Sequence, residues 1–275
     1  MSKHEARDQR LPDSREILLN SIEIDLLDDD NVLACFYGGS IGNENTDLYS
    51  DIDLRIVVAH EKLHSFIAAK NSRPLNWGEV LYFEDTDPLS VYTVAHYDSF
   101  VKVDVFYYTP DKIQPSVWLQ NIEILKDTNG MMASILEKSM KYTYEPSPAE
   151  IEVWRTKFFA HLHEAYRRAM RKEYYYALQS VDNLRLAISA AWYMEKGVQP
   201  NTFGDWAKYE GGRSKLDNWQ KSLLESWECG RSTKEIMSVM KSIVHEFITV
   251  HSSLCKQLDI EEDAELIDKI VNMVI

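Results

Sequence analysis

Two aspartates separated by a single residue, Asp51 and Asp53, lie in a segment where polar and apolar residues alternate from residue 51 to residue 58. Such alternation predicts a β-strand, with both carboxylates on one face and Ile52 and Leu54 on the other. Two carboxylates placed in this way are close enough to ligate a hard divalent cation, which prefers oxygen donors and also binds phosphate. The segment therefore predicts a cation site, although the solvated face of an ordinary edge strand would show the same pattern.

A third aspartate, Asp104, lies in a second alternating segment, where every other residue is valine. A strand here would turn the Asp104 carboxylate away from the valine face, toward a side it can share with Asp51 and Asp53. Three acids in one cleft repel one another, and bound divalent cations relieve that repulsion. We expect these three aspartates to be metal ligands and catalytic residues. Lys102 shares the face of Asp104 and is a candidate phosphate contact, although an exposed strand lysine explains it equally well.

A glycine-rich turn precedes the first two aspartates. An apolar run over residues 32–37 predicts a strand, which enters the tight turn Gly38-Gly39-Ser40. Glycine lets the backbone approach a phosphate closely and present its N–H groups, and the Ser40 hydroxyl can donate to a phosphate oxygen. Gly39 and Ser40 are therefore candidate nucleotide-binding residues.

Together these motifs resemble the signature of the DNA polymerase β-like nucleotidyltransferase superfamily. That signature is a Gly-Ser turn, an Asp-x-Asp on a strand about ten residues later, and a third carboxylate on another strand. All three parts occur in order between Gly38 and Asp104. The resemblance implies that Asp51 and Asp53 bind two Mg²⁺ ions, and that Asp104 completes one of the two sites.

A small mixed α/β domain followed by a helical bundle is similar to the antibiotic nucleotidyltransferases, which modify hydroxyls of aminoglycosides or lincosamides. This resemblance implies transfer of a nucleoside monophosphate, AMP from ATP, to a small-molecule hydroxyl with release of pyrophosphate. Asp104 is then a candidate for taking the proton from the attacking hydroxyl. Two other readings stay open: a nucleotidyltransferase that acts on a protein acceptor, as in toxin–antitoxin pairs, and a non-catalytic regulatory protein that only binds nucleotide.

The elements that must position these residues are of two kinds, and the fold class we expect is α+β. We expect a helix capped by Asp13, a connecting helix over residues 60–70, and further strands over residues 80–83, 91–95 and 100–108. Beyond Pro146 and Pro148 the alternation gives way to helical spacing. We therefore predict a mixed-sheet nucleotidyltransferase domain over residues 1–145 and an all-α helical bundle over residues 146–275. Helices are expected from Trp154 onward and over residues 174–196, 216–227, 233–258 and 262–274, with a loop over residues 197–213.

Three features of the predicted bundle are further candidates. Arg185 stands in an apolar stretch where a charge needs a partner, so it is a candidate phosphate contact that neighbouring Asp182 would also satisfy. Glu164 is a candidate for a separate general base, although an exposed helix glutamate is the simpler explanation. The loop over residues 203–213 mixes aromatic residues, charges and glycines, and we expect acceptor contacts there or aromatic anchors in the core.

Composition limits the possible partners. The formal net charge is -14, which disfavours binding to a nucleic-acid backbone. No apolar run reaches the length of a membrane span and no secretory signal is present, so we expect no membrane contact and a cytoplasmic location. The three cysteines are far apart and show no zinc-ligand spacing. Exposed aromatic surface on the bundle would permit a homodimer.

Overall fold

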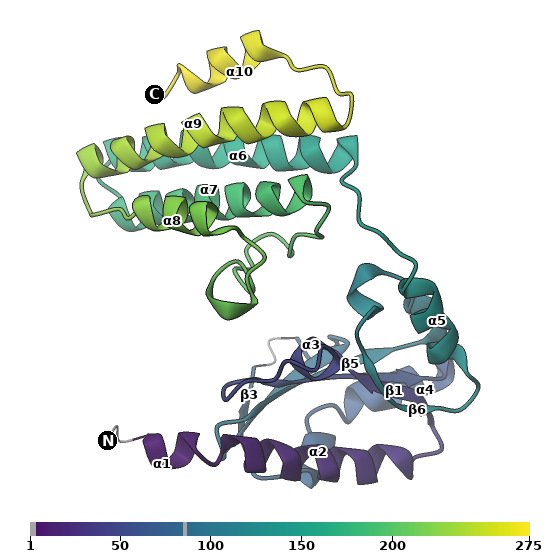
Figure 1. Ribbon diagram of the computed structural model, residues 1–275. Helices are drawn as coiled ribbons and strands as arrows, with labels where there is room; N and C mark the ends of the chain where they lie inside the picture. Colours follow the sequence, from purple (N-terminus) through teal and green to yellow (C-terminus); the bar gives the residue numbers. More distant parts are fainter. Residues whose placement is uncertain (1–3, 85–86) are drawn as a thin grey trace. The chain divides into compact units, whose positions relative to one another are not determined.

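The segments that hold the three aspartates form the centre of a six-stranded sheet (Figure 1). The computed structural model describes residues 4–84 and 87–275. The strands are β1 Val32–Tyr37, β2 Ile52–Val58, β3 Val80–Phe83, β4 Tyr92–Tyr97, β5 Lys102–Tyr108 and β6 Glu123–Asp127. Their order in the sheet is β3-β4-β5-β2-β1-β6, with β2 and β5 parallel and the other described pairs antiparallel. The sheet is therefore mixed, as expected.

The two faces of this sheet are packed differently. On one face, Ile52, Leu54 and Ile56 of β2 join Leu18 and Ile22 in the larger buried cluster of this part of the chain. The other face carries a smaller cluster, in which Val57 meets Met132 and Ile135. Because side chains alternate along a strand, Asp53 belongs to the face with the smaller cluster. The larger core thus fixes the strands while the aspartates stay outside it.

Five helices accompany the sheet among the described residues. They are α1 Glu5–Asp8, α2 Leu11–Leu27, α3 Gly39–Gly42, α4 His60–Ala68 and α5 Met131–Ser139. The prediction that Asp13 caps the first long helix is wrong, because α2 already begins at Leu11, with Arg10 at the N-cap. Pro12 explains the earlier start, since proline fits the first turn of a helix, where its missing N–H costs no hydrogen bond.

The C-terminal region is helical. Its helices are α6 Pro148–Met170, α7 Tyr174–Glu195, α8 Asn218–Ser226, α9 Thr233–Gln257 and α10 Ala264–Val271. A capping box starts α6, where the Ser147 side chain accepts a hydrogen bond from the Glu150 backbone and the Glu150 carboxylate accepts one from the Ser147 N–H. Phe158 of α6 stacks on Phe247 of α9 with ring centroids 4.0 Å apart. The helices expected from periodicity are confirmed, and residues 197–213 contain only the short 3₁₀ turn Gly211–Arg213 among their described residues.

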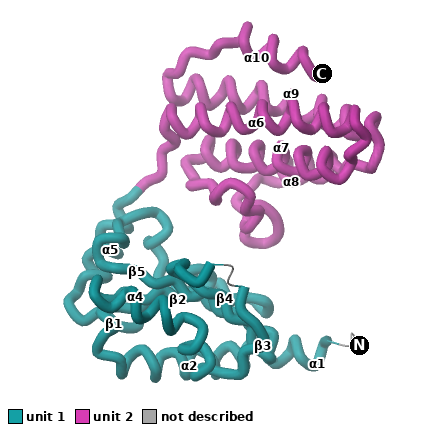
Figure 2. The backbone as a smooth tube through the Cα atoms, turned by 180° about the vertical axis from the view of Figure 1, so that it is seen from behind, with its two compact units in different colours: residues 1–142 teal, residues 143–275 magenta. Residues whose placement is uncertain are grey.

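The chain divides into two compact units, Met1–Tyr142 and Thr143–Ile275, which Figure 2 shows in separate colours. Short 3₁₀ turns at Arg73–Asn76, Pro110–Lys112 and Val117–Leu119 complete the first unit. None of the described helices is both long and apolar enough to cross a membrane.

Candidate active site

The parallel pairing of β2 and β5 brings two of the three aspartates together. Asp53 and Asp104 are direct partners in the register of these neighbouring strands. Asp51 lies one residue before β2 and so precedes Asp53 on the same face. The sheet therefore gathers three carboxylates from residues that are up to 53 positions apart in the chain.

Lys102 connects the carboxylates of this group. Its Nζ lies 3.0 Å from Asp51 Oδ2 and 3.0 Å from Asp104 Oδ2. Burial alone would lower the pKa of Lys102, but the hydrogen bonds to Asp51 and Asp104 outweigh it and leave the pKa raised. The ammonium group is therefore firmly charged and partly neutralises the carboxylates.

Burial perturbs the carboxyl group of Asp104. Burial raises the pKa of its carboxyl above the usual range, the hydrogen bond from Lys102 opposes this, and the nearby charges of Asp51 and Asp53 add to it. Its Oδ1 atom is buried and has no hydrogen-bond partner among the described residues. A buried carboxylate oxygen without a partner is costly, so this atom is available to a ligand that offers positive charge or a proton.

The predicted glycine turn forms the four-residue helix α3 beside Asp53. The Gly38 N–H donates to the Asp53 carbonyl at 2.9 Å, which ties the turn to β2. Gly39 has a φ of 55°, and a Cβ added there would lie 1.8 Å from Asp53 Oδ2. Only glycine fits this position, because both the left-handed backbone and the close carboxylate exclude a side chain.

Ser40 is buried in this turn, with 6% of its surface exposed. Its hydroxyl has no hydrogen-bond partner among the described residues, and no side chain caps the start of α3. The hydroxyl is therefore a donor available to an anion next to the carboxylates.

Two arginines support the site, and neither was expected there from the sequence. Arg15 is buried in α2, and its Nη1 donates to the Ser50 carbonyl at 2.9 Å, which holds the residue just before Asp51. The sequence contained a signal for this role of Arg15. Arg15 lies on the apolar stripe of α2, and a charge on a buried face needs a partner. Arg55 follows Asp53 on the same face, and its Nη2 lies 3.4 Å from Asp53 Oδ1.

The residues of this site fit a hard divalent cation. Within residues 4–84 and 87–275, no three His, Cys, Asp or Glu side chains are already gathered as in a formed metal site. Here the Lys102 ammonium lies between two of the carboxylates instead. The available metal ligands are carboxylate oxygens, which Mg²⁺ prefers. They include the buried Oδ1 of Asp104, which has no partner among the described residues.

The other predicted site residues belong to the second unit. Arg185 lies in α7, where its guanidinium lies 3.4 Å from Asp182 Oδ1 and donates to the Trp227 carbonyl. Glu164 lies in α6 and accepts a hydrogen bond from Arg168 at 2.6 Å, which lowers the pKa of Glu164 and weakens it as a base. Both side chains thus have partners within their own unit, and their predicted roles stay predictions.

The loop over residues 203–213 contains both buried and exposed side chains. Tyr209 is buried in the core, and its hydroxyl accepts a hydrogen bond from the Asn201 N–H at 3.1 Å. Trp206 and Glu210 line a hollow of about 490 Å³ together with Arg185. Phe203 is 57% exposed and lines a separate cavity. The loop therefore contains both core anchors and exposed wall residues.

Solved structures of two proteins of the nucleotidyltransferase type are similar to this chain. One is an aminoglycoside 6-adenyltransferase from Bacillus subtilis, with a TM-score of 0.45, 12% identity, and coverage of 94% of this chain and 97% of that one. The other is a nucleotidyltransferase-like protein from Exiguobacterium sibiricum 255-15, with a TM-score of 0.45, 13% identity, and coverage of 88% and 77%. No family model matches the chain, and no curated protein matches its sequence.

Proposed function

We propose that this protein transfers a nucleoside monophosphate from a nucleoside triphosphate, ATP in the first instance, to a hydroxyl group of a small molecule. The observation that carries the proposal is the register of β2 and β5, which pairs Asp53 with Asp104 directly. Asp51 joins them through the shared Lys102 ammonium. Three carboxylates beside a turn with an unpartnered serine hydroxyl suit a triphosphate that carries divalent cations.

In this reaction the acceptor hydroxyl oxygen forms a bond to the α-phosphorus, and the bond from that phosphorus to pyrophosphate breaks. Asp51, Asp53 and Asp104 would hold Mg²⁺, which when bound supplies positive charge that stabilises the leaving pyrophosphate. Asp104 suits the role of proton acceptor, because its buried Oδ1 has no hydrogen-bond partner among the described residues. The Ser40 hydroxyl would donate to a phosphate oxygen, and Lys102 would hold Asp51 and Asp104 in place until the substrate binds.

The acceptor class follows the resemblance of the architecture, a small mixed α/β domain followed by a helical bundle, to antibiotic nucleotidyltransferases, so aminoglycosides and lincosamides are the first compounds to test. Pyrophosphate release should be measured with Mg²⁺, each of the common nucleoside triphosphates and both acceptor panels. We expect release that depends on an acceptor and is strongest with ATP.

The Asp53→Asn variant tests the site in the same assay, and we expect it to lower the rate by about 100-fold or more. Asp30→Asn is the matched control, because Asp30 is an exposed aspartate outside the group. Acceptor-dependent release that survives Asp53→Asn would refute the assignment of this site. Nucleotide binding without release for any acceptor would favour the non-catalytic alternative.

A further inference from the structure

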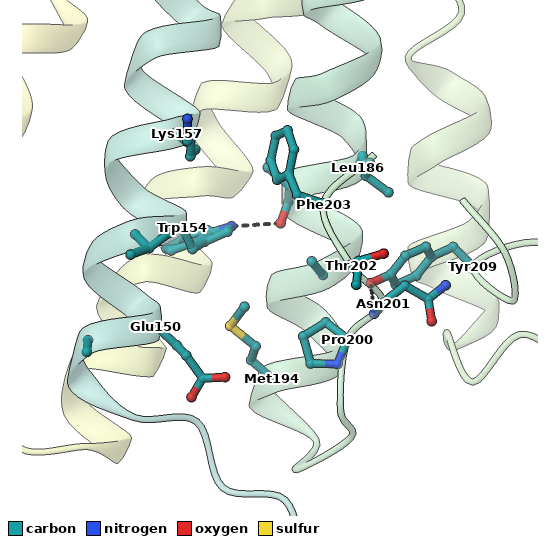
Figure 3. A pocket seen from close by; sticks show the side chains of 14 residues that line it. Glu150, Trp154, Lys157, Leu186, Met194, Pro200, Asn201, Thr202, Phe203 and Tyr209 are labelled. Atoms are coloured by element: carbon teal, nitrogen blue, oxygen red, sulfur yellow. Dashed lines mark hydrogen bonds between the residues drawn. The ribbon is translucent and has the colours of Figure 1, made fainter. Parts of the chain in front are cut away.

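The helical unit contains a cavity of about 350 Å³. Helices α6 and α7 and the loop after α7 bound it (Figure 3). Its lining includes Trp154, Ala190, Met194, Phe203 and Tyr209. The volume lies within the range of small-molecule sites, which is roughly 300 to 1,000 Å³.

Most polar groups in the wall of this cavity are already engaged within the protein. Trp154 Nε1 donates to the Ala187 carbonyl at 2.8 Å, and Tyr209 accepts from the Asn201 N–H, as the dashed lines in Figure 3 show. The Asn201 side chain donates to the Ala207 carbonyl, and the Glu150 carboxylate is part of the cap of α6. A ligand therefore meets mainly aromatic and aliphatic surface, and its body must be apolar.

Large apolar side chains stand exposed at this cavity. Phe203 is 57% exposed and Val153 is 61% exposed, and both belong to the lining. The Phe203 ring stacks on His161 with centroids 5.4 Å apart and an interplanar angle of 9°. Exposed apolar residues that gather at a concave site are typical of binding surfaces, and a ring held by stacking is preorganised to receive a planar ligand.

Lys157 is the one basic residue among the described residues that line this cavity. It is exposed and forms no ion pair with any described residue. Burial and the charge of Lys157 both lower the pKa of His161, so His161 adds no charge here at neutral pH. In a protein with a formal net charge of -14, an unpaired lysine beside an apolar cavity is a local site for an anion.

We propose that this cavity binds a small molecule with an aromatic or alicyclic body and one carboxylate, with the body against Trp154 and Phe203 and the carboxylate on Lys157. None of the three aspartates lines this cavity, and its ligand is inferred from the cavity's own residues. Its residues all belong to the helical unit.

The probe for the test is 2-naphthoate, titrated calorimetrically into the full-length protein. We expect saturable binding with one site per chain. Val153→Trp, which fills the cavity from an exposed position, and Phe203→Ala, which removes a wall, should each weaken binding about tenfold. Trp219→Ala is the control, because Trp219 is similarly exposed at 54% and does not line the cavity. Absence of binding, or equal affinity in Val153→Trp and the unaltered protein, would overturn the proposal.

The role of Lys157 has its own test, the comparison of 2-naphthoate with the neutral 2-naphthamide. We expect the carboxylate to bind about threefold more tightly, and Lys157→Met to remove that preference while the amide still binds. Lys241→Met, at another exposed lysine, should leave the preference unchanged. Equal binding of the two probes by the unaltered protein would refute the carboxylate assignment. The Asp53→Asn variant should bind 2-naphthoate normally, which separates this result from failure of the proposed enzyme activity.

Discussion

Gly38 and Gly39 are adjacent in the chain, yet the structure gives them different constraints. A Cβ at Gly38 would meet nothing within 4 Å, whereas at Gly39 it would lie 1.8 Å from Asp53 Oδ2. Gly39 also has a φ of 55°, which side chains disfavour. The two positions therefore form a matched pair for testing whether the approach of the turn to Asp53 matters.

We predict that Gly39→Ala lowers pyrophosphate release by about 100-fold, because a displacement of about 1 Å in a catalytic group has effects of that order. Gly38→Ala should stay within about threefold of the unaltered rate. Steady-state rates for both variants, with circular dichroism to confirm folding, make the comparison. Equal activity of the two variants would show that the position of Asp53 is not critical.

A second prediction concerns Lys102 and the charge balance of the three acids. Without divalent cations its ammonium is the group that bridges Asp51 and Asp104. Lys102→Met should therefore lower the free energy of unfolding in metal-free buffer by about 1 kcal/mol, since the site is partly screened by solvent.

Added Mg²⁺ should raise the melting temperature of Lys102→Met more than that of the unaltered protein, because the cation then replaces the missing charge. Lys112→Met is the control, since Lys112 is exposed and pairs only with Asp111 among the described residues. A melting temperature that Mg²⁺ leaves unchanged in Lys102→Met would argue against cation binding by these carboxylates.

The alternation of residues was sufficient to place Asp53 and Asp104 on strands, Asp51 directly before one of them, and all three on one face. It was not sufficient to show that β2 and β5 are parallel neighbours, because strand order depends on contacts between distant segments. The anchoring of Ser50 by Arg15 likewise joins residues 35 positions apart. Local pattern therefore identified the acids but not the groups that position them.

At the scale of elements, most of the long helices and strands were predictable from their own residue pattern. The strands over residues 32–37 and 80–83 coincide with β1 and β3. β6 and α5 were missed. In the case of β6, Glu123–Asp127 is a short edge strand of only five residues with no buried member. Its pairing with β1, rather than its own pattern, makes it a strand.

Helix α9 contains a buried histidine that gives the helical unit a pH dependence. His251 is fully buried, stacks on Trp154 and Phe247, and its Nδ1 lies 3.4 Å from Glu262 Oε1. Burial lowers the pKa of His251 below 6.5, and the hydrogen bond with Glu262 only partly opposes this. The folded state therefore holds this ring neutral, while the unfolded chain takes up a proton below about pH 6.5.

A lowered histidine pKa contributes stability that is fully present above about pH 6.5 and is lost as the pH falls from there through the pKa of the folded state. We predict that the free energy of unfolding decreases from neutral pH toward pH 5, as measured by urea denaturation followed by far-UV circular dichroism. His251→Gln should flatten this decrease, at a cost of about 1–3 kcal/mol at neutral pH from lost packing. His245→Gln, at an exposed histidine, should keep the full pH dependence.

At the scale of the whole molecule, each buried apolar cluster belongs to one compact unit. The large cluster around Phe158 and Phe247 draws only on residues after Tyr142. The two clusters on the sheet draw only on residues before it. Since burial of apolar surface is the main stabilising contribution, each unit contains the main source of its own stability.

We therefore predict two separable unfolding transitions in scanning calorimetry of the full-length protein. Leu26→Ala and Leu162→Ala are matched variants, because both leucines are fully buried, one in each unit, and each substitution should cost about 2–5 kcal/mol. Leu26→Ala should lower one transition only, and Leu162→Ala only the other. Mg²⁺ with a nucleoside triphosphate should raise the transition that Leu26→Ala lowers, because ligand binding stabilises the unit that holds the site. A single transition that both substitutions shift would instead mean that the two units unfold as one cooperative structure.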